Sequence, residues 1–156
     1  IHSFMKTIPE DSAIIFCEHY ALNMLILYYS QLSKSDNIDF AVDINVPCCI
    51  TVSDSDISVL VGNLLENALD ACSSQKKRER QIVVCGRIEN NCLLFTIDNT
   101  FENNIRKNPD GVYFSSKHSG TGIGIESARA IVERYKGILR TEQKNGVFYT
   151  SVLLNL

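Results

Sequence analysis

The stretch 61-VGNLLENALDAC-72 carries the most informative pattern in this sequence. At about 100° per residue, its polar side chains share about 100° of helix arc and its apolar side chains occupy the other side. The polar positions are Asn63, Glu66, Asn67 and Asp70. A solvated helix face usually carries Lys, Arg and Glu, so two asparagines favour a binding role over the alternative of an ordinary wet face. Their amide oxygens suit Mg²⁺ beside phosphates, and we expect this face to line a cleft.

A second pattern, 120-GTGIGIESAR-129, places three glycines at alternate positions before an expected helix. Glycine lets the backbone approach a ligand closely, and the free N–H groups at a helix N-terminus favour phosphate. No Lys-Ser or Lys-Thr follows these glycines, and a polar stretch precedes them, which excludes a P-loop and a dinucleotide-binding turn. We expect a phosphate-binding loop, with a structural turn as the alternative.

Hydrophobic periodicity around these two patterns predicts a layered domain. The expected helices cover 13–33, 56–73 and 125–135, and the expected strands cover 38–44, 48–52, 82–88, 92–98, 138–141 and 147–154. We expect the first two strands to pair as a hairpin, Ser53 or Asp54 to cap the second helix, and Gly137 to be the C′ glycine of the third. The order predicts one α+β domain over 1–156, a two-layer sandwich with three helices on a mixed, mostly antiparallel sheet of five or six strands.

Composition excludes several classes of protein. Fifteen basic and 18 acidic residues give a net charge of −3, without the positive excess of a nucleic-acid binder. No apolar run reaches the roughly 20 residues of a membrane helix, so we expect no membrane contact from this segment. The start at Ile1 suggests a piece of a longer polypeptide. The six cysteines form no CxxC pair, and we expect reduced, buried thiols rather than a zinc site.

Four segments in this order resemble the motifs of the GHKL family of ATP-binding domains. The N box is 61-VGNLLENALDA-71, a degenerate first glycine box begins at Asp98-Asn99-Thr100, the F box is 113-YFSSK-117, and the second glycine box is 120-GTGIG-124. The resemblance covers nearly the whole chain and is greatest to the catalytic domains of sensor histidine kinases, particularly the peptide-pheromone-sensing branch. It implies a Bergerat-type fold that holds ATP under a mobile lid, here residues 101–119.

The resemblance also implies a role for each matched residue. Asn67 would coordinate Mg²⁺, Asn63 would lie beside the phosphates, and Asp70 would line the nucleoside end. Asp98 would accept the exocyclic amine of adenine, a contact that Asn99 could share. Lys117 would meet the phosphates as a point charge, and the backbone of Gly120, Thr121, Gly122, Ile123 and Gly124 would close over them.

Two departures from the family pattern bear on the chemistry. Both glycines of the first box are missing, at Thr100 and Glu102, which leaves its loop geometry and the ATP affinity open. Asn63 stands where ATP-hydrolysing members carry a glutamate, and an amide cannot act as a general base. Phosphotransfer therefore fits better than hydrolysis. Asn63, Glu66 and Lys117 form the candidate catalytic set, with simple solvent exposure as the alternative for Glu66.

The implied function is that of the kinase domain of a two-component sensor histidine kinase. It would bind Mg²⁺ and ATP and transfer the γ-phosphate to a histidine on a separate upstream dimerisation domain, for a response regulator downstream. We assign no phosphoacceptor in this chain, and we expect a cytoplasmic domain of a membrane-anchored sensor. The alternatives are a serine kinase of the anti-sigma type and a pseudokinase that serves as a binding module.

Overall fold

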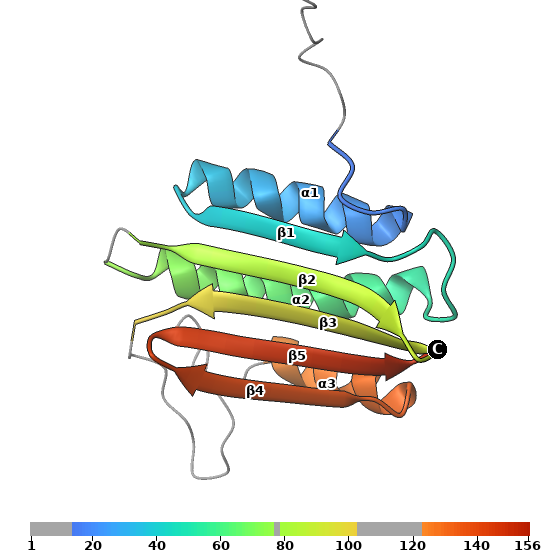
Figure 1. Cartoon of the computed structure of the whole chain (residues 1–156). Coiled ribbons are helices and arrows are strands. Elements are labelled where there is room, and N and C mark those ends of the chain that lie inside the picture. The colour runs from blue at the N-terminus through green and yellow to red at the C-terminus, as the bar shows by residue number, and fades with distance from the viewer. Residues whose placement is uncertain (1–13, 77–78, 103–122) are drawn as a thin grey trace, which may run out of the picture.

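The computed structural model describes residues 14–76, 79–102 and 123–156, which form three helices and five strands (Figure 1). The helices are α1 (Tyr20–Ser35), α2 (Asp54–Ser73) and α3 (Ile123–Arg134). The strands are β1 (Asp39–Asn45), β2 (Gln81–Glu89), β3 (Cys92–Thr100), β4 (Ile138–Lys144) and β5 (Val147–Asn155).

The strands form one sheet in the order β1-β2-β3-β5-β4, and all three helices cover the same face of it (Figure 1). β1 and β2 are parallel and joined through α2, whereas the other neighbours are antiparallel. Along β3 the side chains from Leu93 to Asn99 are buried at every second position, as expected when one face packs on helices. The predicted two-layer α+β sandwich is confirmed.

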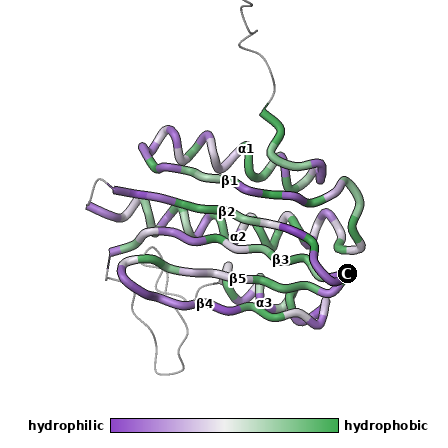
Figure 2. The backbone as a smooth tube through the Cα atoms, in the orientation of Figure 1, coloured by the Kyte–Doolittle hydropathy of each residue, from purple (hydrophilic) through white to green (hydrophobic). Residues whose placement is uncertain are grey.

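The core lies between the helices and the middle of the sheet. Figure 2 shows a hydrophobic central stretch in β2 and a hydrophilic β4 at the edge of the sheet. Leu65 of α2, Ile26 of α1 and Val84 of β2 are completely buried. Such side chains supply most of the stabilisation, because each is removed from water on folding. The charged edge strand disfavours pairing with another sheet.

Two predictions for the first third of the chain are wrong, one about where a helix begins and one about a strand. The first helix begins at Tyr20 rather than at 13, because His19 Nδ1 accepts the Leu22 N–H at 3.4 Å and caps the helix there. No strand forms over 48–52, so the predicted hairpin is absent and β1 pairs with β2 instead. Val46 and Val52 are nevertheless buried, so the apolar residues of this segment enter the core from a loop.

The other turns follow the sequence pattern. Asn90 and Asn91 both take positive φ between β2 and β3, and Asn145 and Gly146 do so between β4 and β5. These are the backbone conformations that tight hairpin turns require, and asparagine and glycine adopt them at least cost. Ser53 caps α2 as predicted, since its side chain accepts from the Asp56 N–H at 3.1 Å.

Gly137 is needed for a reason other than the predicted one. The left-handed residue after α3 is Lys136, with φ of 50°. A Cβ at Gly137 would lie only 2.1 Å from the carbonyl oxygen of Leu153 in β5. Glycine at this position therefore lets the turn between α3 and β4 lie directly on the sheet.

Gly137→Ala is expected to destabilise the chain by about 1–3 kcal/mol, because the added methyl must displace backbone. Urea unfolding followed by circular dichroism measures this. Gly62→Ala is the matched control, since its added Cβ would meet only Leu25 Cδ2 at 3.8 Å and alanine favours the interior of α2. Equal midpoints for the two variants would contradict the close approach.

Candidate functional site

The polar face of α2 is half-buried rather than fully wet. Asn63, Asn67 and Asp70 are of intermediate exposure, whereas Glu66 is exposed. The opposite side of the helix is in the core and buries Ile57, Leu60, Val61, Leu64, Leu65, Ala68 and Cys72. Within the described chain the amides of Asn63 and Asn67 make no hydrogen bond, so their oxygens are available to a ligand.

The start of α3 lies against these two asparagines. A Cβ on Gly124 would lie 3.6 Å from both Asn63 Cβ and Asn67 Nδ2. A helix N-terminus carries unpaired N–H groups and a partial positive charge, which attract phosphate. The structure thus joins the end of the glycine stretch to the polar face of α2. The other expected contributors, Lys117 and residues 120–122, lie outside the described residues, as does the side chain of Ile123.

The far end of α3 is tied to the first turn of α2. The carboxylate of Asp56 accepts a hydrogen bond from Tyr135 Oη at 2.6 Å and pairs with Arg134 Nη1 at 2.6 Å. Tyr135 Oη in turn accepts the Ser53 N–H at 3.2 Å. The Tyr135 hydroxyl, more than the Arg134 guanidinium, holds the pKa of Asp56 below its ordinary value. These contacts fix the direction of α3 across α2.

Asp56→Asn is expected to remove a part of the stability that depends on pH. Because the folded-state pKa of Asp56 is lowered, its contribution is complete above the unfolded-state value of about 3.9 and is lost as the pH falls through the folded value. Thermal unfolding of both proteins at several pH values should show a deficit in the variant at pH 7 that shrinks in acid. The exposed Asp43→Asn is the control, and a deficit that is the same at all pH values would contradict the expectation.

β3 presents Asn99, and not Asp98, to the helix layer. Asn99 is 3% exposed and shares its face with Ile97, against which α2 packs. Its Nδ2 donates to the Thr100 carbonyl at 3.0 Å, so Oδ1 remains as the acceptor. Asp98 points to the uncovered face, opposite Tyr149 in register, where partial burial raises its pKa. This placement does not support the expected contact of Asp98 with adenine.

The described part of the segment that lacks the family's glycines continues β3 along the sheet. Residues 98–102 contain no left-handed φ, and the Phe101 N–H donates to the Gly146 carbonyl at 3.0 Å, which prolongs the pairing of β3 with β5. Gln75, a buried residue after α2, donates from Nε2 to the Thr100 carbonyl at 2.7 Å. The Lys76 N–H donates to Glu102 Oε1 at 2.9 Å. Side chains and backbone after α2 therefore set this geometry.

A family model for the GHKL domain matches residues 53–155. This chain belongs to the GHKL family. The match begins at the cap of α2 and ends in β5, so it includes both asparagines, Gly124 and the end of β3.

A curated relative supports this membership. The "Probable C4-dicarboxylate sensor kinase" of Halalkalibacterium halodurans is 35% identical over 97 residues, which are 60% of this chain and 18% of the relative. This chain thus spans less than a fifth of the length of the curated relative that it matches. The resemblance to the peptide-pheromone-sensing branch stays a prediction.

Solved structures show the same fold. The catalytic domain of histidine kinase ThkA superimposes with a TM-score of 0.69 at 17% identity, over 87% of this chain and 90% of that one. The mycobacterial sensor histidine kinase MprB gives 0.65 at 16% identity, over 86% of this chain and 93% of that one. The fold described above is therefore also the fold of these two kinase domains.

Tyr29 of α1 lies next to the polar face of α2, and no sequence motif marks it. Its hydroxyl donates to the Gly62 carbonyl at 3.2 Å. Burial raises the pKa of Tyr29 most, and the negative charges of Glu66 and Asp70 raise it further. α1 therefore borders the acidic end of the polar face. The exposure of Glu66 agrees with the alternative that it faces solvent.

His19 has a structural role in the GHKL domain. It is 2% exposed, and its second ring nitrogen, Nε2, lies 3.5 Å from Asp54 Oδ1.

Within the ranges that the structure describes, no helix is long and apolar enough to cross a bilayer. In the same ranges, no group of three or more His, Cys, Asp or Glu side chains is arranged to hold a metal. A magnesium ion here would depend on amide oxygens and on the nucleotide.

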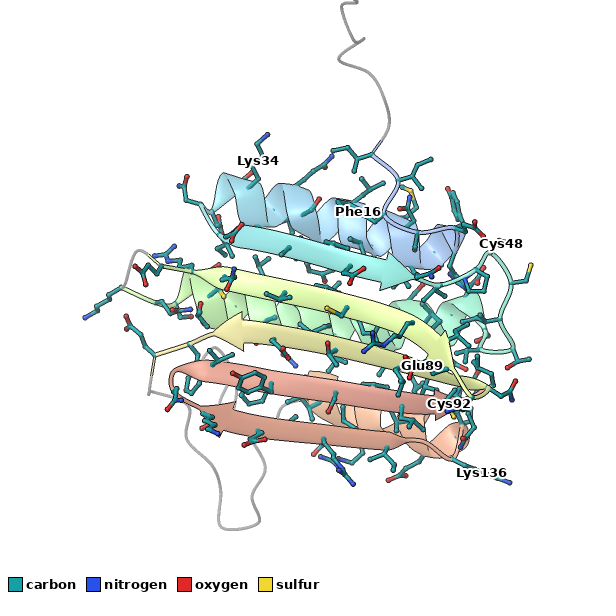
Figure 3. All side chains as sticks on the ribbon, viewed as in Figure 1. Phe16, Lys34, Cys48, Glu89, Cys92 and Lys136 are labelled. Atoms are coloured by element: carbon teal, nitrogen blue, oxygen red, sulfur yellow. The ribbon has the colours of Figure 1, made fainter. Side chains whose placement is uncertain are left out.

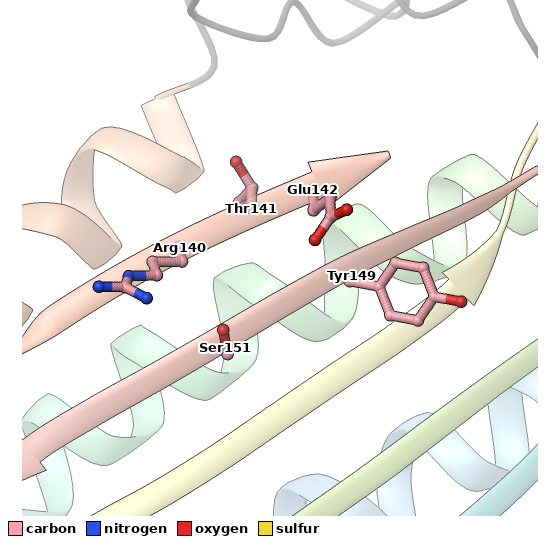
Figure 4. Close-up of a pocket in the computed structure, with 5 residues that line it drawn as sticks. All are labelled: Arg140, Thr141, Glu142, Tyr149 and Ser151. Atoms are coloured by element: carbon pink, nitrogen blue, oxygen red, sulfur yellow. The ribbon is translucent and has the colours of Figure 1, made fainter. Parts of the chain in front are cut away.

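A shallow hollow lies on the face of the sheet that the helices leave uncovered (Figure 4). Its lining comes from β4 and β5 and consists of Arg140, Thr141, Glu142, Tyr149 and Ser151. Tyr149 is the register partner of Asp98. The sheet separates this hollow from α2. Asp98 therefore lies on the same face as the hollow and not on the face of Asn63 and Asn67.

Proposed function

We propose that this chain is the catalytic domain of a sensor histidine kinase, which binds Mg²⁺ and ATP and transfers the γ-phosphate to a histidine on a separate dimerisation domain. One observation carries the proposal: the N-terminus of α3 at Gly124 is packed on Asn63 and Asn67. In this proposal, the N–H groups at the start of α3 bind phosphate and the amides of α2 hold the metal at the same place. Membership of the GHKL family supports it.

In this proposal, residues of α2 and of the glycine stretch hold the phosphates and the metal. Asn67 holds Mg²⁺ through its oxygen, Asn63 lies beside the phosphates, and Lys117 with the amides of 120–124 neutralises their charge. The metal, when bound, supplies positive charge to the β- and γ-phosphate oxygens. The half-buried amides without hydrogen-bond partners among described residues fit this role.

Asn99 reads the base in this proposal. Its Oδ1 is an acceptor on the covered face of β3, and the Thr100 carbonyl holds the amide in that orientation. An acceptor is what the exocyclic amine of adenine requires. Asp70, farther along α2 than Asn67, borders the nucleoside.

Phosphotransfer is favoured over hydrolysis because no general base stands at position 63. Positioning and charge neutralisation then supply most of the catalysis. The acceptor domain, a response regulator and a membrane-anchored, cytoplasmic setting belong to the same proposal. The pseudokinase alternative rests on the missing glycines of the first box, and the ATP-binding experiment below tests it.

Calorimetry of ATP binding to the 156-residue chain, with and without Mg²⁺, tests the proposal. We expect binding that Mg²⁺ strengthens, followed by phosphate transfer to the dimerisation domain of the same polypeptide. An acid-labile product identifies phosphohistidine, whereas an acid-stable one would indicate the serine-kinase alternative. A folded chain that binds no ATP would overturn the proposal.

A further inference from the structure

Two adjacent cysteines stand apart from the other thiols of the chain. Cys48 and Cys49 are both free and exposed, in the loop between β1 and α2. Figure 3 labels Cys48 on this loop. Cys17 and Cys72 are buried. The remaining two, Cys85 and Cys92, lie on different strands and are partly buried. Only residues 48 and 49 place two accessible thiols next to each other.

The loop that carries this pair is anchored on both sides. Val46 before it is 1% exposed, and Val52 after it is 2% exposed. Ile50 packs against the core, and Pro47 has a fixed φ. With its flanks buried, the loop holds Cys48 and Cys49 at the surface in a defined conformation.

The two thiols belong to consecutive residues of the loop. The neighbouring Cys48 thiol, more than the negative charge of Asp54, raises the pKa of Cys49. A thiolate is the nucleophile of thiol–disulfide exchange, and after one of these residues has reacted, the second thiol is on the adjacent residue.

We propose that Cys48 and Cys49 form a vicinal dithiol that is oxidised to an intrachain disulfide by low-molecular-weight disulfides. The Cys48 thiolate attacks one sulfur of the reagent, forming a mixed disulfide and releasing one thiolate. Cys49 then loses its proton to solvent and attacks Cys48 Sγ, which releases the second thiolate. Two protein thiols are oxidised, and one disulfide is reduced to two thiols.

The position of the pair connects it to the nucleotide-binding helices. Its loop ends at Ser53, which caps α2 and whose N–H donates to Tyr135 Oη beyond α3. Closing a small ring five residues earlier changes the backbone that leads into this junction. Oxidation is therefore expected to lower the midpoint of thermal unfolding, and a thiol reductant is expected to restore it.

Oxidised glutathione is the probe, applied in excess to the reduced chain and followed by peptide mass spectrometry with fragment ions. In the wild-type chain we expect the segment with residues 48 and 49 to lose two hydrogens and to carry no glutathione. Cys48→Ser and Cys49→Ser should each keep one glutathione there, because no second thiol can release it. Cys85→Ser is the matched control and should behave as the wild type.

Two results would overturn the proposal. One is a wild-type chain that keeps glutathione on Cys48 or Cys49, as the single variants do. The other is an unmodified pair under conditions in which the partly buried Cys92 reacts. Circular dichroism of every variant confirms that the fold is retained, and neither result depends on nucleotide binding.

Discussion

Asn67→Ala is expected to remove the dependence of ATP binding on Mg²⁺. In the presence of Mg²⁺, the variant should bind ATP about 10-fold to 100-fold more weakly than the wild type. The amide is half-buried beside Gly124, without a hydrogen bond to any described residue, so alanine leaves the core intact. What it removes is an oxygen ligand at the place where the metal meets the phosphates. Calorimetric titration with ATP, with and without Mg²⁺, measures the ATP affinity and its dependence on the metal.

Val59→Ala is the matched control for this prediction, since Val59 is exposed on the same helix and 45% of its surface is accessible. It should bind ATP as the wild type does. If Asn67→Ala keeps the magnesium dependence while its unfolding midpoint is unchanged, the metal is held elsewhere and the role of α2 must be revised.

Asn99→Leu is expected to weaken ATP binding by about 5-fold to 150-fold, because the adenine amine would be buried against a side chain without an acceptor. Asp98→Ala, which removes the neighbouring acceptor altogether, should change binding by less than about 2-fold, since this side chain lies on the other face of the sheet. Titration of both variants with ATP and Mg²⁺ separates the two neighbours. Asn99→Asp restores an acceptor and should bind more tightly than Asn99→Leu.

The opposite ranking has a specific meaning. If Asp98→Ala loses ATP binding and Asn99→Leu retains it, the base lies on the uncovered face, near the hollow lined by Tyr149 and Ser151. The nucleotide could not then reach the asparagines of α2 across the sheet. Comparable losses in both variants, with altered circular dichroism, would indicate damage to β3 itself.

The sequence predicted elements well where the signal is local. The second helix, both β-hairpins after it and the cap at Ser53 follow from periodicity, turn residues and side chains within a few positions. The strand expected over 48–52 failed because its apolar residues are buried from a loop, which composition cannot distinguish from a strand. The polar face of α2 was also predictable, since helical spacing alone groups Asn63 with Asn67.

Contacts between distant segments were not predictable in the same way. Matching the first glycine box by its initial letter selected Asp98, but the pairing of β3 with β2 and β5 decides which neighbour faces the helices. Gln75 and Tyr29 carried no motif, and only packing brings them to Thr100 and to the acidic end of α2. The motif assigns the base contact to Asp98 and the strand pairing assigns it to Asn99, which differ by one residue along β3.

The two ends of α3 are held by different contacts. Asp56 fixes the C-terminal end through Arg134 and Tyr135, while the N-terminal end lies at Gly124 against Asn63 and Asn67. A phosphate bound at the N-terminal end would add contacts at that end alone. Amide hydrogens in the first turn of α3 should therefore exchange more slowly when nucleotide is present, while those near Arg134 keep their rates. Nucleotide occupancy would then be measured as a gradient of exchange protection along a single helix.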